Sequence, residues 1–121
     1  MEKREELVIE RELSFSKITV RVFSVGEDCL IVLEGGDSPH IGGCVLAVPR
    51  PSLTGEGISC TSSVINVSGH KDEQLLRLLA EKKCKTSGQV VVCTGGFHKD
   101  NITKDQIREA EKAAAEIAES L

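Results

Sequence analysis

The feature that most constrains this chain is the segment of residues 35–43, which reads GGDSPHIGG and lies between two apolar runs. Glycines, a proline and a histidine packed so closely impose more backbone requirements than an ordinary turn. Closely spaced glycines leave backbone N–H groups available to a bound anion, and Pro39 biases Ser38 toward an extended conformation. His40 is therefore expected on a stiff support. Two interpretations stay open here: a ligand-binding loop, or a tight connection between strands in which His40 is structural.

Length and composition favour one globular domain covering residues 1–121, because 121 residues with 40% hydrophobic content can form one core. The formal net charge is -4, and the only aromatic residues are three Phe. Both properties argue against a nucleic-acid partner. No apolar stretch approaches the ~18 residues of a membrane span, and the charged N-terminus has no apolar region behind it. We therefore expect neither membrane association nor a signal peptide.

Cysteine usage points to a reducing compartment. The five cysteines include no CxxC pair, and most lie in apolar, strand-like runs: Cys29, Cys44, Cys60, Cys84 and Cys93. An odd number of buried thiols is typical of reduced core cysteines rather than of a disulfide framework. We expect a cytoplasmic protein.

Hydrophobic periodicity predicts six strands and two helices in the order β-β-β-β-β-α-β-α. The run 29–33 is apolar on both faces, as in a central strand, and the run 44–48 is expected to stop at Pro49 and Pro51. Asn101 or Thr103 is expected to cap the last helix. The expected strands are 7–13, 17–25, 29–33, 44–48, 58–67 and 89–94, and the expected helices are 72–85 and 104–120.

These elements predict an α+β fold with a mixed, mostly antiparallel sheet of about six strands and both helices on one face. The first five strands are expected to form a meander, with 49–57 as either a long hairpin end or a flap. The chain from strand 58–67 to strand 89–94 is long enough for a parallel crossover. The second face of the sheet must then meet solvent or another subunit.

All three histidines, His40, His70 and His98, follow apolar strands in segments that contain glycine. The tripeptide His-Lys-Asp occurs twice, at 70–72 and 98–100, each time between a strand and a helix. If those two strands are parallel neighbours, both tripeptides lie at the same edge of the sheet. Open α/β sheets bind ligands there, outside the carboxyl ends of the strands.

This edge is suited to an anion such as phosphate. Helix N-termini offer N–H groups and partial positive charge, and Lys71 and Lys99 would add full charges. Asp72 and Asp100 have a simpler structural interpretation, since aspartate commonly caps a helix or occupies its first turn.

Two catalytic interpretations remain to be tested. Three converging histidines with a water could form a catalytic zinc site, although the spacings of 30 and 28 residues match no short zinc signature. A Cys–His nucleophile pair could be Cys93 with His98 or Cys60 with His70, but Cys93 lies in an apolar run where it would be inert. No nucleophile elbow, P-loop or dinucleotide fingerprint is present.

Three segments together resemble one small family: 36–42 (GDSPHIG), 69–72 (GHKD) and 96–102 (GFHKDNI). They are similar to the LpdD-type accessory subunit of hydroxybenzoate and gallate decarboxylases. The resemblance runs from about Asp28 to the C-terminus, and its most specific part is the first segment. The third segment has Phe97 where a smaller aliphatic residue would also fit.

The resemblance implies a non-catalytic chaperone that binds reduced prenylated FMN and delivers it to an apo-decarboxylase of the UbiD type. It also implies a fold like that of proteasome assembly chaperones and a homodimer. A metal-dependent small hydrolase that uses the three histidines, or a ligand-free assembly factor, are the alternatives. The cofactor-binding residues that the resemblance and the histidine segments indicate are Gly36, Asp37, His40, Gly42, Gly69, His70, Lys71, Gly96, His98 and Lys99.

Overall fold

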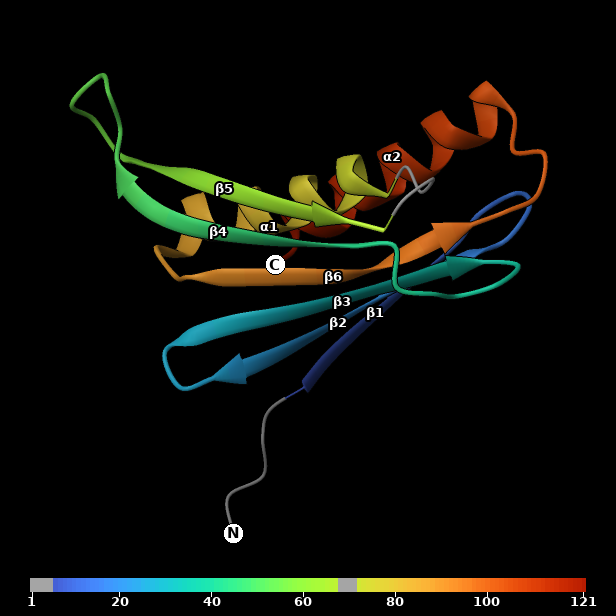
Figure 1. Cartoon of the computed structure of the whole chain (residues 1–121), viewed down its shortest axis with the longest axis horizontal. Helices are drawn as coiled ribbons and strands as arrows, with labels where there is room; N and C mark the ends of the chain where they lie inside the picture. Colours follow the sequence, from blue (N-terminus) through green and yellow to red (C-terminus); the bar gives the residue numbers. More distant parts are fainter. Residues whose placement is uncertain (1–5, 68–71) are drawn as a thin grey trace, which may run out of the picture.

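The computed structural model describes residues 6–67 and 72–121 (Figure 1). Its strands and helices follow one another in the predicted order, and most of their bounds agree with the sequence pattern. The elements are β1 Glu6–Glu12, β2 Lys17–Val25, β3 Asp28–Gly36, β4 Gly43–Pro51, β5 Ile58–Asn66, α1 Glu73–Ser87, β6 Val91–His98 and α2 Lys104–Glu119.

The strands form one mixed sheet in the order β1-β2-β3-β6-β4-β5. The β3–β6 pairing is parallel and the others are antiparallel. The predicted meander is therefore correct only for β1 to β3, because β6 is inserted between β3 and β4. The connection 37–42 must cross the end of β6, a span of two strand spacings or about 10 Å. This explains why the chain is not a tight turn there.

The strands that precede the histidine segments share a direction. β4 runs antiparallel to both β5 and β6, so these two strands are parallel, with β4 between them rather than as direct neighbours. β3 is parallel to β6 as well. The carboxyl ends of β3, β5 and β6 consequently lie at one edge of the sheet, which is the edge expected to carry ligand-binding residues.

Both helices lie on one face of the sheet, as predicted (Figure 1). α1 packs mainly against β4, β5 and β6, whereas α2 packs against α1 and β2. The alternate residues of the central strands that face the helices are buried with one stripe of each helix. The largest fully buried side chains include Ile31, Leu33, Leu76, Leu79 and Ile117.

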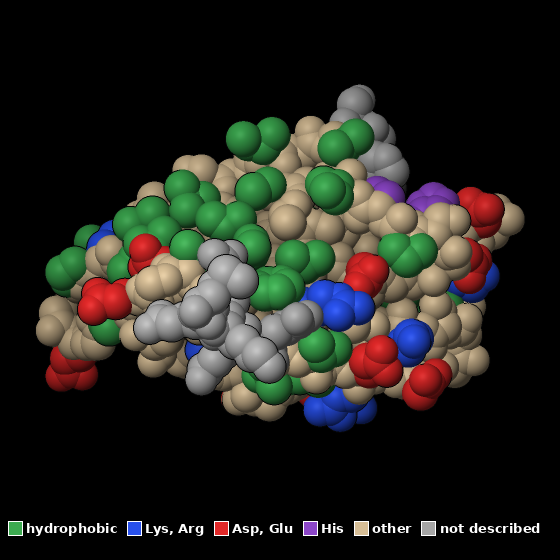
Figure 2. Space-filling view, turned by 90° about the horizontal axis from the view of Figure 1, so that it is seen from below, with side chains coloured by type: hydrophobic (Ala, Val, Ile, Leu, Met, Phe, Trp, Pro, Cys, Tyr) green, Lys and Arg blue, Asp and Glu red, His purple; other side chains and the backbone are tan. Residues whose placement is uncertain are grey.

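The opposite face of the sheet is not covered by either helix. Exposed hydrophobic side chains lie on it, among them Leu46, Val48 and Ile65. Seen from below, hydrophobic side chains gather over a broad part of the molecule, with the histidines beyond its right end (Figure 2). We call the side chains Val8, Leu46, Val48 and Ile65, with the strand residues between them, the open face.

Several predicted boundaries are wrong because strands extend further than their apolar runs. Gly35 and Gly36 belong to β3, Gly43 belongs to β4, and β6 continues through His98. β4 also passes through its prolines, which are tolerated because β4 pairs with β6 only as far as Ala47. The connection 49–57 is a hairpin end, since Pro51 pairs with Ile58.

Glycine is required where β6 extends beyond its apolar run. Gly95 has φ +119, and a Cβ there would collide with the carbonyl oxygen of Leu33 on the parallel strand. Gly36 has φ +81, and its Cβ would collide with the carbonyl oxygen of His98. The two glycines thus let the ends of β3 and β6 approach each other at the histidine edge.

Gly95→Ala is expected to destabilise the protein by about 3–5 kcal/mol, because a left-handed backbone and a backbone collision add together. Gly55→Ala is the matched control, since Gly55 also has a positive φ, +83, but has open space around its Cβ position. It should cost only about 1–2 kcal/mol. Urea unfolding followed by circular dichroism measures both, and equal losses would contradict the close approach of β3 and β6.

Candidate functional site

The connection between β3 and β4 is fastened across the end of β6. The N–H of Asp37 donates to the carbonyl of His98 at 2.7 Å, and the N–H of Gly42 donates to the carbonyl of Gly95 at 2.7 Å. The N–H of Val67, which follows β5, donates to the carbonyl of Gly42 at 2.8 Å. These bonds hold the connection, and with it His40, against the carboxyl ends of β5 and β6.

Asp72 is the buried acid at this edge, with a side chain only 4% exposed. It occupies the N-cap position of α1, but its side chain makes no capping hydrogen bond. Instead Oδ1 accepts a hydrogen bond from the N–H of Phe97 at 2.7 Å, and Oδ2 lies 3.0 Å from Nε2 of His40. One carboxylate therefore joins α1, β6 and the 37–42 connection.

Two of the predicted glycines make room for this contact. A Cβ at Gly42 would collide with Oδ2 of Asp72, and a Cβ at Gly96 would lie 3.0 Å from the same oxygen. Both Cβ positions also fall 2.9 Å from Nε2 of His40. The glycines at these positions are required because the carboxylate and the imidazole pass directly over the backbone.

His98 lies beside His40, with ring centroids 5.7 Å apart and the planes at 83°. Nε2 of His98 is 2.9 Å from Oδ1 of Asp100, whose side chain is exposed. Nζ of Lys99 is 4.0 Å from Oδ2 of Asp37. We call His40, His98 and Lys99 the cationic rim, since each can carry positive charge at this edge.

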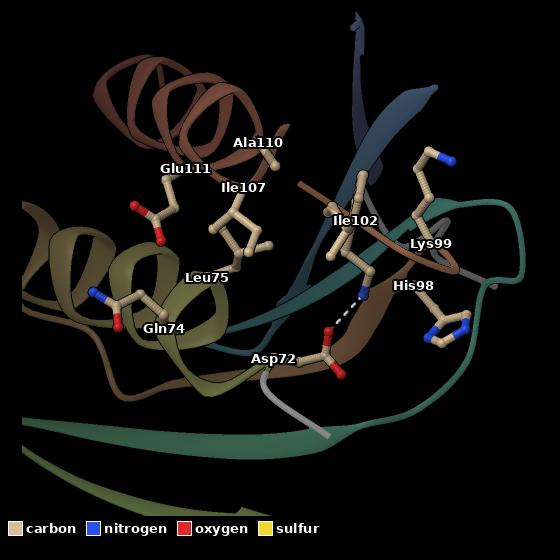
Figure 3. Close-up of a pocket in the computed structure, with 10 residues that line it drawn as sticks. Asp72, Gln74, Leu75, His98, Lys99, Ile102, Ile107, Ala110 and Glu111 are labelled. Atoms are coloured by element: carbon tan, nitrogen blue, oxygen red, sulfur yellow. Dashed lines mark hydrogen bonds between the residues drawn. The ribbon is translucent and has the colours of Figure 1, made fainter. Parts of the chain in front are cut away.

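A pocket of about 450 Å³ opens next to the cationic rim, between the first turns of α1 and α2 and the end of β6 (Figure 3). Its apolar wall comes from Leu75, Phe97, Ile102, Ile107 and Ala110, and the ring of Phe97 is supported from behind by Phe15. Its other lining residues are Asp72, Gln74, His98, Lys99 and Glu111.

The charges around the pocket are not evenly distributed. The carboxylates of Asp72 and Glu111 lie around the aliphatic side chains, whereas the Lys99 ammonium extends away from the centre of the pocket (Figure 3). The wall between the two helices is thus apolar with acidic groups beside it, while His98 and Lys99 line the pocket at the end of β6. An anionic group is better placed on the cationic rim than inside the pocket.

The structure brings seven of the ten residues indicated by the sequence to one edge. His40 and His98 are in ring contact, although His40 is not among the residues that line the pocket and reaches it through Asp72. Gly69, His70 and Lys71 lie outside the described residues. The seven residues at this edge are Gly36, Asp37, His40, Gly42, Gly96, His98 and Lys99.

Sequence reasoning misses Asp72 and most of the pocket wall. Asp72 occupies the N-cap position of α1, as its structural interpretation expects, but its carboxylate makes no capping hydrogen bond and is turned toward the sheet. The sequence pattern assigns Ile107 and Ala110 only to the core stripe of the last helix. α2 is capped by Thr103, which forms a capping box with Gln106. The repeated His-Lys-Asp tripeptide is a signal, but its two aspartates differ completely in burial.

The catalytic alternatives gain no support from the described residues. Within ranges 6–67 and 72–121, no three His, Cys, Asp or Glu side chains are grouped so that they could hold a metal ion. Burial raises the pKa of the Cys93 thiol far above its usual range, so this cysteine is a poor nucleophile. No helix in the described part of the chain is long and apolar enough to cross a membrane.

The arrangement defines a class first: a small α+β domain, one mixed sheet with two helices on one face, whose fold is shared with a proteasome assembly chaperone structure. The crystal structure described as a novel chaperone complex for yeast 20S proteasome assembly matches with a TM-score of 0.54. The match covers 95% of this chain and 93% of that chain at 13% sequence identity, so it concerns the fold alone. The predicted likeness to proteasome assembly chaperones is confirmed.

The family follows from the sequence itself. Residues 14–121 match the family described as "Prenylated flavin chaperone LpdD-like domain". The chain therefore belongs to this family, which confirms the resemblance found in the three glycine-histidine segments. No curated protein matches the chain.

Proposed function

We propose that this protein binds reduced prenylated FMN at the pocket and cationic rim and delivers it to an apo-decarboxylase of the UbiD type. The observation that carries this proposal is the apolar pocket of about 450 Å³ beside the cationic rim, in a chain of the prenylated flavin chaperone family. A phosphorylated ring compound needs both kinds of surface, one for its ring system and one for its phosphate.

The pocket suits the ring system of such a ligand. Leu75, Phe97 and Ile107 offer an apolar wall to the fused rings and to the added prenyl group. Asp72 and Glu111 lie at its border, where their oxygens can accept hydrogen bonds from ring N–H groups. The same carboxylates repel a phosphate, so the ligand is expected to enter with its ring system first.

The cationic rim suits the phosphate. His40 and His98 lie side by side. Lys99 follows His98 in the chain, and its side chain extends in the opposite direction, with the ammonium directed away from the pocket (Figure 3). The N-terminus of α1, which begins at Glu73, adds the partial positive charge of its backbone N–H groups. We place His70 and Lys71 in the same group by the sequence pattern.

The proposed role is that of a carrier without a reaction of its own. Membership of a chaperone family supports it, and so does the state of Cys93, whose buried thiol gives the described part of the site no activated cysteine. The partner would be a UbiD-type decarboxylase in the cytoplasm. Transfer requires that the ligand is held by a shallow site at the sheet edge rather than enclosed by the core.

We further propose that the working unit is a homodimer that pairs through the open face. A sheet must be covered on both faces to exclude water from its apolar side chains, and the two helices cover only one of them here. On this face Leu46 of β4 is 39% exposed and Ile65 of the edge strand β5 is 76% exposed. A second copy presenting the same surface would bury both.

Ile107→Glu should weaken binding of reduced prenylated FMN by about tenfold or more, because it places a carboxylate on the apolar wall. Ile107 is 40% exposed, so the fold should tolerate the change. Lys112→Gln alters the net charge of the same helix by the same amount outside the pocket, and its affinity should stay unchanged. Anaerobic titration followed by flavin absorbance measures both. A wild-type protein that shows no saturable binding would remove the proposal outright.

Loaded protein should activate an apo-decarboxylase of the UbiD type faster than the same concentration of reduced prenylated FMN in solution. A carrier protects the cofactor and presents it at a defined surface, which free ligand does not. Decarboxylation rates under anaerobic mixing measure the effect. Activation no faster than with free cofactor would leave binding intact but remove the delivery role.

Leu46→Glu should convert the dimer to monomer, because it introduces a charge among the apolar side chains of the open face. Leu53→Glu is the matched control, since Leu53 is 93% exposed in the β4–β5 hairpin end and lies off this face. Sedimentation velocity distinguishes the two states. If both variants and the wild type sediment as monomers, the open face is not a dimer interface.

A further inference from the structure

Asp72 directs its carboxylate to other elements of the fold rather than to its own helix. An aspartate at an N-cap position usually accepts hydrogen bonds from its own helix, but the Asp72 side chain makes no such capping bond. Its two oxygens contact Phe97 and His40, which belong to other elements. A carboxylate that is only 4% exposed is costly to bury unless such contacts compensate, so its direction has consequences for His40.

His40 has acceptor oxygens on both sides of its ring. Nε2 lies 3.0 Å from Oδ2 of Asp72, and Nδ1 lies 3.2 Å from the carbonyl oxygen of Ser38. A neutral imidazole carries one N–H and can donate to only one of these oxygens, whereas the doubly protonated ring donates to both. The contact with Ser38 is on the exposed side of the ring.

We propose that Asp72 is a positioning residue: by accepting a hydrogen bond from Nε2–H of His40, it fixes the imidazole so that Nδ1 is directed to the exposed side of the rim. This rests on the proposed function in one respect, namely that the ligand is anionic. With Nε2 fixed by Asp72, the Nδ1–H group is directed to the exposed side. There a phosphate oxygen can take the place of the Ser38 carbonyl as its acceptor.

The other groups around His40 are consistent with this division of roles. Among the described residues, His98 packs edge-to-face against the His40 ring, and His98 is itself paired with the exposed Asp100. Lys99 is near Asp37 rather than near Asp72. Asp72 is thus the buried carboxylate that the described structure places on His40, and Asp100 is its solvent-exposed counterpart on the neighbouring ring.

Asp72→Asn is the informative substitution, because it keeps the shape and reverses one hydrogen bond. The amide oxygen of the asparagine can still accept from the N–H of Phe97, so its NH₂ group must face Nε2 of His40. His40 would then accept at Nε2 and carry its only proton on Nδ1. We expect the ¹⁵N spectrum of the His40 ring to show a proton on Nε2 in the wild-type protein and none on Nε2 in the variant.

The same variant should bind reduced prenylated FMN about tenfold more weakly, because a ring that accepts at Nε2 and carries its only proton on Nδ1 can still donate to the phosphate, but no longer as a charged donor. Asp100→Asn is the comparison, since it makes the same chemical change to the exposed partner of His98 and should leave the ¹⁵N spectrum of the His40 ring unchanged. An unchanged affinity in Asp72→Asn protein whose His40 ring has lost its Nε2 proton would overturn the proposal.

The ¹⁵N spectrum of the His40 ring in the ligand-free wild-type protein tests the role of Asp72 even if Asp72→Asn does not fold. A His40 ring that lacks a proton on Nε2 near neutral pH would overturn the proposal, and a protonated Nε2 supports it. This readout needs no ligand. If the wild-type protein failed to bind reduced prenylated FMN, the proposed function would fall while the role of Asp72 would still be decided by the spectrum.

Discussion

The histidine edge of this protein depends on one buried carboxylate. Asp72 accepts a hydrogen bond from the backbone of β6 and contacts the His40 ring, while its own backbone begins α1. Three segments that are far apart in the sequence thereby meet within one residue's reach. Burying this charge is favourable only because both oxygens have partners and because it lies at the positive end of a helix. Glycine at 42 and 96 makes this arrangement possible, because a Cβ at either position would crowd the Asp72 carboxylate and the His40 ring.

The sheet order explains why the site lies where it does. Because β6 is inserted between β3 and β4, the chain leaving β3 has to pass over the carboxyl end of β6 before it can enter β4. That passage brings His40 to His98, although the two residues belong to segments separated by β4, β5 and α1. A direct β3–β4 hairpin would have left the two imidazoles on separate strands. The crossing is therefore the structural origin of the cationic rim.

Much of the fold can be predicted from the sequence. Alternation in 17–25, the doubly apolar run 29–33 and the amphipathic stripes of both helices are local signals, and they identify the elements and their order. The insertion of β6 cannot be predicted in this way, because strand pairing depends on contacts between distant residues. Strand ends are also missed, since Gly35, Gly36 and Gly95 have low strand propensity and belong to strands through pairing with distant residues.

The candidate site is also only partly predictable from the sequence, because only some of its residues stand out by residue type. His40 and His98 and the glycines near them stand out by residue type, and their position at the ends of the parallel strands β3 and β6 places both histidines on one edge. The sequence does not indicate Asp72 and Ile107 as site residues, because an aspartate before a helix and an isoleucine on an amphipathic stripe have common structural explanations. Their role emerges only when the helix starts are placed over the end of β6, where both residues line the pocket.

The central claim is that the ligand binds at the pocket and cationic rim, and not on the open face. Amide chemical shifts recorded during anaerobic titration with reduced prenylated FMN test it most directly. The account predicts that the largest changes occur at Phe97, His98 and Ile107, with little change at Leu46 and Ile65. Largest changes at Leu46 and Ile65, with an unperturbed Phe97, would contradict it.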